Sequence, residues 1–315
     1  MRERLVFMGT PPFAVPSLEA LARDHEVAAV VTQPDRPARR GRKVTPCAVK
    51  KAALELGLPV VQPASLREGE AVAELTRLAP TVMVVAAYGQ ILRPQVLAIP
   101  PAGVLNVHPS LLPKYRGASP IAGALLAGEQ QTGVTIMLMD EGMDTGPILS
   151  QRTVDIDPQD TTGSLGERLA GLGAELLAEV LPAWLEGRIE AQAQDDAQAT
   201  YTKPISKGDG VIDWSLPAID IWHRVRAYNP RPGARTWWKG DQLKVMRARP
   251  LPNWKGEGKP AGVVQLDSGV AVATGEGALL LEEIQLAGKR AMLVEDFVRG
   301  HRDFLGSELG QEVKG

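Results

Sequence analysis

Short apolar runs alternate with amphipathic segments along roughly the first 200 residues. The runs, rich in β-branched residues, predict strands at 4–10, 26–35, 59–63, 81–92, 103–108 and 132–139. Helical spacing is found at 13–24, 46–57, 70–79 and 162–187. Strands without a polar face, alternating with helices, favour a parallel sheet covered on both sides. We therefore predict an α/β fold for residues 1–200, with a doubly wound, Rossmann-like, mostly parallel sheet.

The pattern changes after about residue 208, where Gly, Pro and Trp become frequent. Short alternating runs at 242–250, 262–275 and 277–286 are separated by turn residues. This pattern predicts a smaller antiparallel β-barrel or sandwich in residues 211–315, with one helix at 215–228. Residues 201–210 read as a basic linker between the two domains.

Length and composition agree with this division. A chain of 315 residues exceeds the usual size of one domain, about 100–200 residues.

No run of 18 apolar residues occurs, and the N-terminal stretch lacks the apolar core of a signal peptide, so we expect a cytoplasmic protein that needs no membrane. The single cysteine, Cys47, excludes an internal disulfide and a cysteine-based metal cluster. The four histidines show no i, i+4 pairing, so no metal site is expected, and His25, His223 and His301 read as surface or packing residues.

The net charge of −2 conceals an uneven distribution. Seven cations and no acid lie between Arg36 and Lys51, and twelve Lys or Arg face five acids between Lys203 and Lys259. Residues 260–315 reverse the sign, with five cations and nine acids. Two concentrated basic segments in a nearly neutral chain indicate a polyanionic partner, although a solvated surface explains them equally well at this point.

The candidate chemistry lies around His108. The apolar run 103–108 ends at this histidine, two residues after Asn106, and the run 132–139 ends just before Asp140, Glu141 and Asp144. If both strands run parallel in one sheet, their carboxyl ends bring His108 and the acids to the same edge.

Asn, His and Asp together suit a reaction that passes through a tetrahedral oxyanion. An amide and an imidazole can stabilise the developing charge, and a carboxylate can orient the imidazole. No G-x-S-x-G elbow or placed cysteine supplies a nucleophile, so direct transfer between bound substrates is expected. The residues alone leave open a structural alternative, in which Asn106 and His108 end a strand and Asp144 forms an Asx turn with Thr145.

The segment "NVHPSLLPKYRG" (106–117), followed by "DEGMDTG" (140–146), resembles the signature of the folate-dependent formyltransferase family. Four further segments, "FMGTPPFAVPSLEAL", "VTQPDRPARRGRKVTPCAVKKAA", "VVAAYGQILRP" and "IDWSLPAIDIWHRVRAYNPRPGA", extend the resemblance over nearly the whole chain. They are similar to the branch of the family that formylates methionine on initiator tRNA. Within them, Cys47 stands where that branch more often has serine.

The resemblance implies a C-terminal oligonucleotide-binding (OB)-like β-barrel and transfer of the formyl group of 10-formyltetrahydrofolate, without a metal, to the α-amine of methionine on initiator tRNA. Asn106 and His108 are then the oxyanion-stabilising residues, and Asp144 positions His108. The implied folate-binding residues are Gln90, Ile91, Leu92, Ser110, Leu111, Leu112, Pro113, Met139 and Asp140. Lys114 and Arg116 would be available to the glutamate tail of folate or to nearby phosphates.

The same resemblance assigns the basic segments to tRNA. The implied contacts are Arg36, Arg39, Arg40, Arg42, Lys43, Lys203 and Lys207. Trp222, Trp237 and Trp238 could stack on bases, but a place in the barrel core is favoured. The basic loop argues against a sugar-nucleotide or other small-amine formyltransferase, and the presence of all three catalytic residues argues against a non-catalytic RNA-binding module. We expect the protein to act as a monomer.

Overall fold

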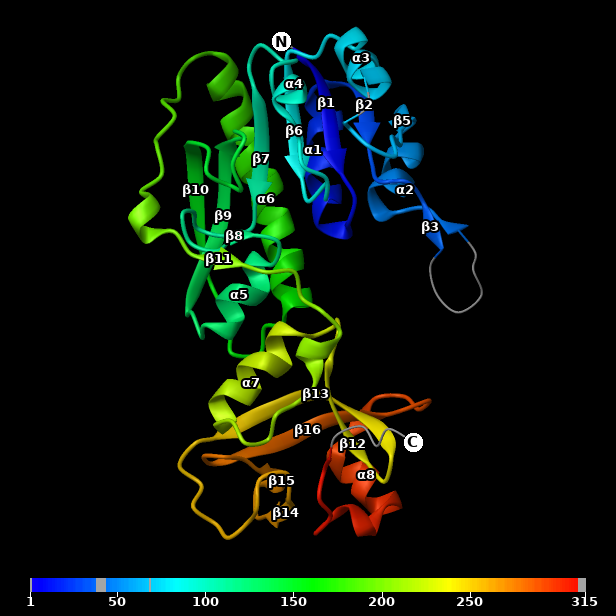
Figure 1. Cartoon of the computed structure of the whole chain (residues 1–315), viewed down its shortest axis with the longest axis vertical. Coiled ribbons are helices and arrows are strands. Elements are labelled where there is room, and N and C mark those ends of the chain that lie inside the picture. The colour runs from blue at the N-terminus through cyan, green and yellow to red at the C-terminus, as the bar shows by residue number, and fades with distance from the viewer. Residues whose placement is uncertain (1, 38–43, 68, 311–315) are drawn as a thin grey trace. The chain divides into compact units, whose positions relative to one another are not determined.

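The computed structural model describes residues 2–37, 44–67 and 69–310. The chain forms two compact units (Figure 1). The first comprises residues 1–120, 131–155 and 166–202, and the second comprises residues 121–130, 156–165 and 203–315. No helix within the described part of the chain is long and apolar enough to cross a membrane.

The first unit is built on a mixed sheet, of which the described residues form seven strands. In spatial order these are β10 (Ile148–Asp155), β9 (Gln131–Leu138), β7 (Val104–His108), β6 (Val82–Ala86), β1 (Arg4–Gly9), β2 (Glu26–Val31) and β5 (Val60–Val61). The five strands from β7 to β5 are parallel, whereas β9 and β10 are antiparallel to their neighbours. The predicted α/β, mostly parallel architecture is confirmed, but the direction expected for residues 132–139 is wrong.

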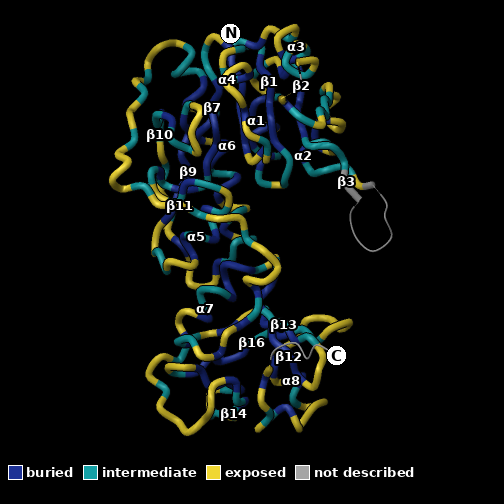
Figure 2. The backbone as a smooth tube through the Cα atoms, viewed as in Figure 1, coloured by how far each residue is buried: buried dark blue, intermediate teal, exposed yellow. Residues whose placement is uncertain are grey.

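Helices cover both faces of this sheet, as the strand composition requires. They are α1 (Val15–Asp24), α2 (Ala48–Glu55), α3 (Gly69–Arg77), α4 (Pro94–Leu97) and α6 (Thr162–Leu185), with the short 3-10 helix η1 (Pro12–Ala14) before α1. Helices α3 and α4 pack on the face that carries Met8, Met83 and Val104. On the opposite face, a Cβ on Gly173 of α6 would lie 2.8 Å from Val107, so only glycine allows this close approach. Figure 2 shows the strands between these layers as buried.

The sequence pattern predicted most of the long elements of the first unit but missed several short ones. The predicted strands and helices of residues 1–200 correspond to β1, β2, β5, β6, β7, β9, α1, α2, α3 and α6. It missed α4, α5 (Pro120–Leu126), β10 and two pairings of two-residue strands, β3 (Arg36–Pro37) with β4 (Val44–Thr45) and β8 (Arg116–Gly117) with β11 (Tyr201–Thr202). Strand β10 was missed because its residues after Leu149 are mostly polar and none of them is buried, as befits the edge of the sheet.

The second unit contains an antiparallel sheet of β12 (Ala234–Trp238), β13 (Asp241–Leu251), β16 (Ala278–Leu286), β15 (Gly269–Ala273) and β14 (Val263–Leu266), with β17 (Met292–Leu293) beside β16. Helices α7 (Ala218–Ala227) and α8 (Val294–Gly300) and the 3-10 helices η3 (Gly208–Gly210) and η4 (Arg302–Phe304) accompany it. The expected helix at 215–228 is confirmed as α7. The 3-10 helix η2 (Asp196–Gln198) belongs to the first unit.

Residues Gly306–Gly310, the closing segment, join the two edges of this sheet. Backbone hydrogen bonds link Gly306 and Ser307 to Val263 of β14, and the N–H and C=O of Gly310 bond to Trp237 of β12 at 2.9 and 3.1 Å. Edge strands that are paired in this way no longer expose free N–H and C=O groups. The sheet thereby becomes barrel-like, as the OB-like expectation requires.

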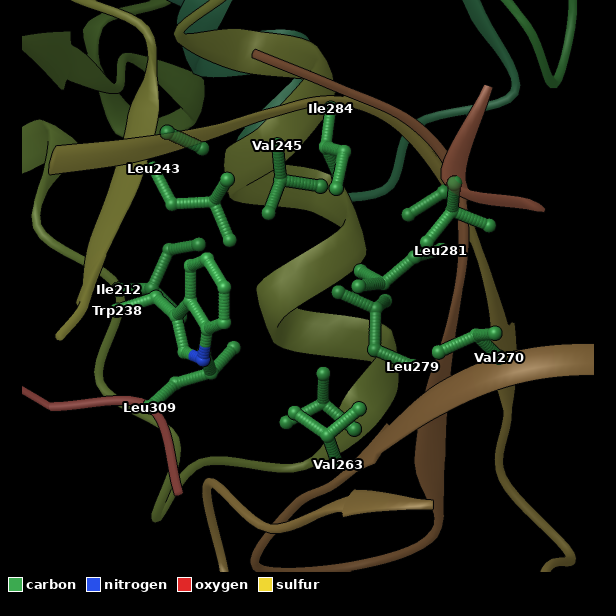
Figure 3. Close-up of a cluster of buried hydrophobic side chains, with 14 of the residues drawn as sticks. Ile212, Trp238, Leu243, Val245, Val263, Val270, Leu279, Leu281, Ile284 and Leu309 are labelled. Atoms are coloured by element: carbon green, nitrogen blue, oxygen red, sulfur yellow. The ribbon is translucent and has the colours of Figure 1, made fainter. Parts of the chain in front are cut away.

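The core of the second unit forms around Trp238. Its indole, 5% exposed, meets Phe297 and Phe304 edge-on with ring centroids 5.4 and 5.5 Å apart. Figure 3 shows it among Ile212, Leu243 and Leu309. The preference for a core role over base stacking is confirmed for Trp238, and Trp222 packs against the same cluster, whereas Trp237, 9% exposed, is not part of it.

Two segments expected in the first domain pack with the second unit instead. They are Ile121–Gln130, with most of α5, and Ile156–Leu165. Arg226 of α7 is 7% exposed, and it donates to the carbonyl oxygens of Asp160 and Asp157 at 2.9 and 2.8 Å. The domain limits 1–200, 201–210 and 211–315 stay a prediction.

Candidate active site

Strand β7 presents Asn106 and His108 on one face of the sheet. Alternate residues of a strand point to the same side, so both follow Val104, which packs toward α3 and α4. Asn106 is 8% and His108 4% exposed. Within the described residues, the carboxamide of Asn106 has no hydrogen-bonding partner, which leaves it available to a ligand.

Both ring nitrogens of His108 face oxygen acceptors. The Nε2 atom lies 3.2 Å from the carbonyl oxygen of Tyr115, and Nδ1 lies 3.6 Å from Oδ1 of Asp144. A carbonyl can only accept, so Nε2 carries a proton. The carboxylate and the carbonyl favour the doubly protonated ring, but burial opposes its charge and is the larger effect, so it lowers the pKa of His108. The imidazole of His108 is therefore neutral at neutral pH.

Asp144 reaches His108 by a route the sequence did not predict. We expected β7 and the strand before Asp144 to be parallel and to end at one edge, but β9 is antiparallel to β7, with His108 opposite Thr135 and Leu105 opposite Leu138. The loop between β9 and β10 must therefore return along the sheet. Asp144 adopts a φ of 55°, and the N–H of Gly117 donates to its Oδ2 at 2.8 Å.

The Asx turn proposed as an alternative for Asp144 exists, but Asp140 makes it. Oδ1 of Asp140 accepts from the N–H of Gly142 at 3.0 Å and from the hydroxyl of Thr145 at 2.7 Å. Asp144 is consequently free to face His108 and Gly117. One carboxylate shapes the loop and the other faces the imidazole.

The predicted folate-binding residues divide into exposed and buried sets. Ile91 is 76% exposed, whereas Leu92 is 4% exposed, so Leu92 can offer only its main chain to a ligand. Gln90 accepts from the N–H of Leu66. The remaining side chains differ in exposure: Ser110 and Leu112 are buried, Leu111, Pro113 and Met139 are half-buried, and Asp140 is exposed.

Arg116 does not have the role that the sequence suggested. Its side chain is 1% exposed, and its guanidinium bonds to Gln194, Asp196 and the hydroxyl of Tyr201. It cannot serve the folate tail or a phosphate without breaking these bonds. Lys114 is exposed and keeps that possibility.

The predicted tRNA-binding residues lie in both units. In the first, Arg36 begins the short pairing of β3 with β4, and Arg39, Arg40, Arg42 and Lys43 lie outside the described residues. Lys50, which belongs to the same basic stretch, is bound to Asp35 and Gln62, each at 2.6 Å. Its charge is therefore largely neutralised inside the protein.

In the second unit, Lys203 and Lys207 are exposed. Lys207 lines a hollow of about 710 Å³ together with Arg231, Arg235 and Lys244. Nη2 of Arg235 donates to the carbonyl of Lys207 at 2.6 Å, which holds these two basic residues together. Four cations around one hollow form a surface suited to phosphate groups.

Two of the other histidines and the cysteine have packing or capping roles. His223 packs on Trp222, and His301 packs on Trp238 and Phe297. Cys47 is the N-cap of α2, where Sγ accepts from the N–H of Lys50 at 3.4 Å. Across residues 2–37, 44–67 and 69–310, no three His, Cys, Asp or Glu side chains are grouped as a metal would require.

Sequence reasoning missed Tyr115, Gln194 and Thr200. Tyr115 contacts His108 through its carbonyl, Gln194 bonds to the carbonyl of Asp144, and Thr200 bonds to the N–H of Tyr115. The segment 188–200 has neither strand nor helix periodicity, and these contacts use main-chain atoms, so no pattern of residue types marks them.

Comparison with known proteins defines the class of this fold and site. Residues 3–181 match the formyl transferase family, and residues 204–302 match the formyl transferase C-terminal domain. The chain is thus an enzyme of the formyl transferase class. Its fold resembles that of an N-formyltransferase from Helicobacter canadensis solved with folinic acid and dTDP-3-aminofucose (TM-score 0.66, 20% identity, 92% of this chain and all of that one). HypX from Aquifex aeolicus shares it too (TM-score 0.65, 17% identity, 98% of this chain and 49% of that one).

Sequence relatives show to which branch of the formyl transferase class the chain belongs. The methionyl-tRNA formyltransferase of Roseiflexus sp. (strain RS-1) is 52% identical over 98% of this chain and 95% of its own length. The methionyl-tRNA formyltransferase of Methylococcus capsulatus is 47% identical over 98% of this chain and 99% of its own length. The chain belongs to the methionyl-tRNA formyltransferase family.

Proposed function

We propose that this enzyme transfers the formyl group of 10-formyltetrahydrofolate to the α-amine of methionine on initiator tRNA, giving N-formylmethionyl-tRNA in the cytoplasm. The observation that carries the proposal is the contact of buried His108 with half-buried Asp144, beside the carboxamide of Asn106, which has no hydrogen-bonding partner among the described residues. This arrangement fits a carbonyl oxygen that gains negative charge as an amine attacks its carbon.

Each residue of the trio has one task in this proposal. The folate donor supplies the formyl group as an activated amide. The carboxamide N–H of Asn106 donates to the formyl oxygen as the new C–N bond forms, and His108 stabilises that oxygen through the positive charge that its ring takes up. Asp144 faces Nδ1 and stabilises the imidazole when it gains a proton. The amine loses one proton and the folate nitrogen receives one as the old C–N bond breaks, so no net proton is gained or lost.

Folate would bind near the carboxyl ends of the parallel strands. Exposed Ile91 with the main chain of Gln90 and Leu92 supports this placement, as does the loop Ser110–Pro113 that follows His108. Met139 and Asp140 follow β9 beside the start of β7 and begin the loop that returns to His108 with Asp144, so this loop would line the folate site along the face of the sheet.

The tRNA would use the two basic regions. The hollow formed by Lys207, Arg231, Arg235 and Lys244, together with Lys203, supports phosphate binding in the second unit. Arg36, Arg39, Arg40, Arg42 and Lys43 would contact the acceptor end. Phosphate contacts fix position and make affinity depend on salt, whereas the unpaired end of the acceptor stem would supply selectivity.

The test uses purified full-length protein, 10-formyltetrahydrofolate and methionine-charged initiator tRNA, with methionine-charged elongator tRNA as the comparison. We expect formyl-methionyl-tRNA from the initiator alone. Replacing His108 by Ala should abolish turnover while tRNA affinity stays within a few-fold. Formylation of a sugar-nucleotide amine with no turnover of either tRNA would refute the proposal and establish the small-amine alternative.

A further inference from the structure

Residues Gln192–Thr202, which we call the strap, connect the end of the α6 region to the second unit. The strap lies against three other parts of the first unit, which are β10, the loop that carries Asp144, and the segment Tyr115–Gly117. Gln192 pairs with Ile148 of β10 through two backbone hydrogen bonds of 2.7 and 2.9 Å. At the other end, Tyr201 and Thr202 pair in parallel with Arg116 and Gly117. The strap is thus fixed at both ends.

Gln194 lies between these ends and contacts the loop of Asp144 directly. Its Nε2 donates to the carbonyl oxygens of Asp144 at 2.8 Å and of Gly146 at 2.7 Å. Its Oε1 accepts from Nε and Nη2 of Arg116 at 3.1 and 2.9 Å. A guanidinium can only donate and a carbonyl can only accept, so the carboxamide has one possible orientation. Both N–H donors and the oxygen acceptor of the carboxamide are therefore occupied.

Arg116 holds Gln194 in this orientation. Its side chain is 1% exposed, and Asp196, whose side chain is 81% exposed, balances its charge at 2.7 Å. Nη1 contacts the hydroxyl of Tyr201 at 3.1 Å. Burying a guanidinium requires such partners, and four hydrogen bonds to residues of the strap supply them. The charge of Arg116 ties the strap to the loop that carries Tyr115.

The strap also holds the second partner of His108. Oγ1 of Thr200 accepts from the N–H of Tyr115 at 2.8 Å, and its carbonyl accepts from the N–H of Arg116 at 2.8 Å. The carbonyl of Tyr115 is the group that faces Nε2 of His108. The groups opposite Nδ1 and Nε2, on two different loops, are therefore both anchored to the strap.

We propose that the strap is a positioning element for the catalytic histidine, and that Gln194 is its main positioning residue, fixing Asp144 relative to His108. Gln194 touches no substrate in this proposal and acts through the main chain of Asp144. The catalytic consequence rests on the proposed formyl transfer. The structural consequence, a fixed environment of the His108 ring, does not.

Two substitutions distinguish the hydrogen bonds that Gln194 donates to the carbonyls of Asp144 and Gly146 from those that it accepts from Arg116. Gln194→Met keeps the length of the side chain and removes its hydrogen bonds. Gln194→Glu keeps an oxygen for Arg116 but places a second oxygen against the carbonyls of Asp144 and Gly146. If the bonds to these carbonyls matter, Glu is as damaging as Met, and if only the partner of Arg116 matters, Glu is tolerated. Gln198→Met, at an exposed glutamine of the same segment, is the matched control.

The first readout is steady-state formyl transfer. Displacing a catalytic group by about 1 Å can cost about 100-fold in rate, so we expect kcat to fall about 10- to 100-fold in both Gln194 variants. KM for folate and for tRNA should stay within about threefold, since no substrate contact is removed. Thr200→Val, which removes one bond to Tyr115, should lower kcat less and is the milder variant if a Gln194 variant does not fold.

The second readout is the ¹⁵N spectrum of the histidine rings at pH 7, which is tractable because the chain has four histidines. We expect the His108 signals to move in Gln194→Met and Gln194→Glu and to stay in Gln198→Met. Unchanged kcat and unchanged signals would overturn the proposal, as would losses that only follow a fall in melting temperature. A wild-type protein without transferase activity would refute the proposed function, while the spectra would still decide the role of the strap.

Discussion

Nδ1 of His108 lies 3.6 Å from Oδ1 of Asp144, although the strands that lead to these two residues run in opposite directions. The loop after β9 brings the carboxylate back to the histidine. The contact between them therefore depends on how that loop is held, rather than on the end of a strand.

Replacing Asp144 by Asn tests the electrostatic part of this contact. The amide keeps the shape of the side chain and an oxygen for the N–H of Gly117, but it loses the charge opposite Nδ1. We expect kcat for formyl transfer to fall about 100-fold or more, with little change in either KM. Glu190→Gln, at an exposed carboxylate of the same unit, is the control. Activity within threefold of wild type would contradict the role of Asp144.

The pH dependence of stability tests the burial of His108. Burial lowers the pKa of this imidazole below the usual value of about 6.5, so the unfolded chain takes up the proton first as pH falls. Its stabilising contribution is present above pH 6.5 and is lost as pH falls through the folded-state pKa. We expect the melting temperature of the wild type to drop more steeply between pH 7.5 and 5.5 than that of His108→Gln, whose side chain does not titrate. Parallel curves would exclude this explanation, since His25 and His223 are common to both proteins.

The basic hollow of the second unit predicts a change in the salt dependence of tRNA binding. Lys207→Met and Lys244→Met each remove one cation that lines it. The slope of log affinity against log salt should become shallower by about 0.7–0.9 for each phosphate that is no longer neutralised. Filter binding from 50 to 300 mM salt measures this. Lys259→Met, at a lysine that does not line the hollow, should leave the slope unchanged. An equal change of slope in this variant would show that the cations of the hollow contribute no more to tRNA binding than other surface lysines.

Cys47 offers a stability test that is independent of catalysis. Its sulfur accepts the N-cap hydrogen bond of α2 at 3.4 Å, and sulfur is a weak acceptor. Serine is among the preferred N-cap residues, so Cys47→Ser should raise the melting temperature, whereas Cys47→Ala should lower it. Differential scanning calorimetry measures both. A lower melting temperature for the serine variant would mean that packing of the sulfur outweighs its role as a cap.

Arg226 tests the limits of the second unit. Its two carbonyl partners, in Asp157 and Asp160, lie outside a fragment that begins at Lys203. In the whole protein, Arg226→Leu should destabilise the second unit by removing the two hydrogen bonds that the guanidinium donates to these carbonyls. In the fragment 203–310 the same substitution should cost much less, because the partners are already gone. Equal losses of melting temperature in both backgrounds would favour a domain that begins at the linker.

The sequence predicted the elements that have a strong period, and its candidate catalytic residues His108 and Asp144 do lie together in the structure. Strands such as β6, which is buried on both faces, and the long helix α6 leave a clear pattern. Asn106, His108 and Asp144 were found because their types suit the reaction and their motif resembles a family. The direction of β9 was not predictable, because an apolar run has the same composition whichever way it crosses the sheet.

The support of the site was also hidden from sequence reasoning, for a different reason. Gln194 and Thr200 act on the main chain of Asp144 and Tyr115, and any residue presents a carbonyl or an N–H there. Arg116 looked like a phosphate ligand because an arginine in a loop usually reaches solvent. Only the structure shows that it is enclosed by the strap.

The closing segment has a consequence for the order in which the protein is made. Residues 306–310 follow every strand of the second sheet in the chain, yet they supply the hydrogen bonds that cover both of its edges. While the protein is being synthesised, β12 and β14 must emerge from the ribosome with their edges open, and they stay so until this segment leaves the exit tunnel. The nascent second unit is then exposed to pairing with neighbouring chains. Pauses in translation just before residue 306 would lengthen that interval.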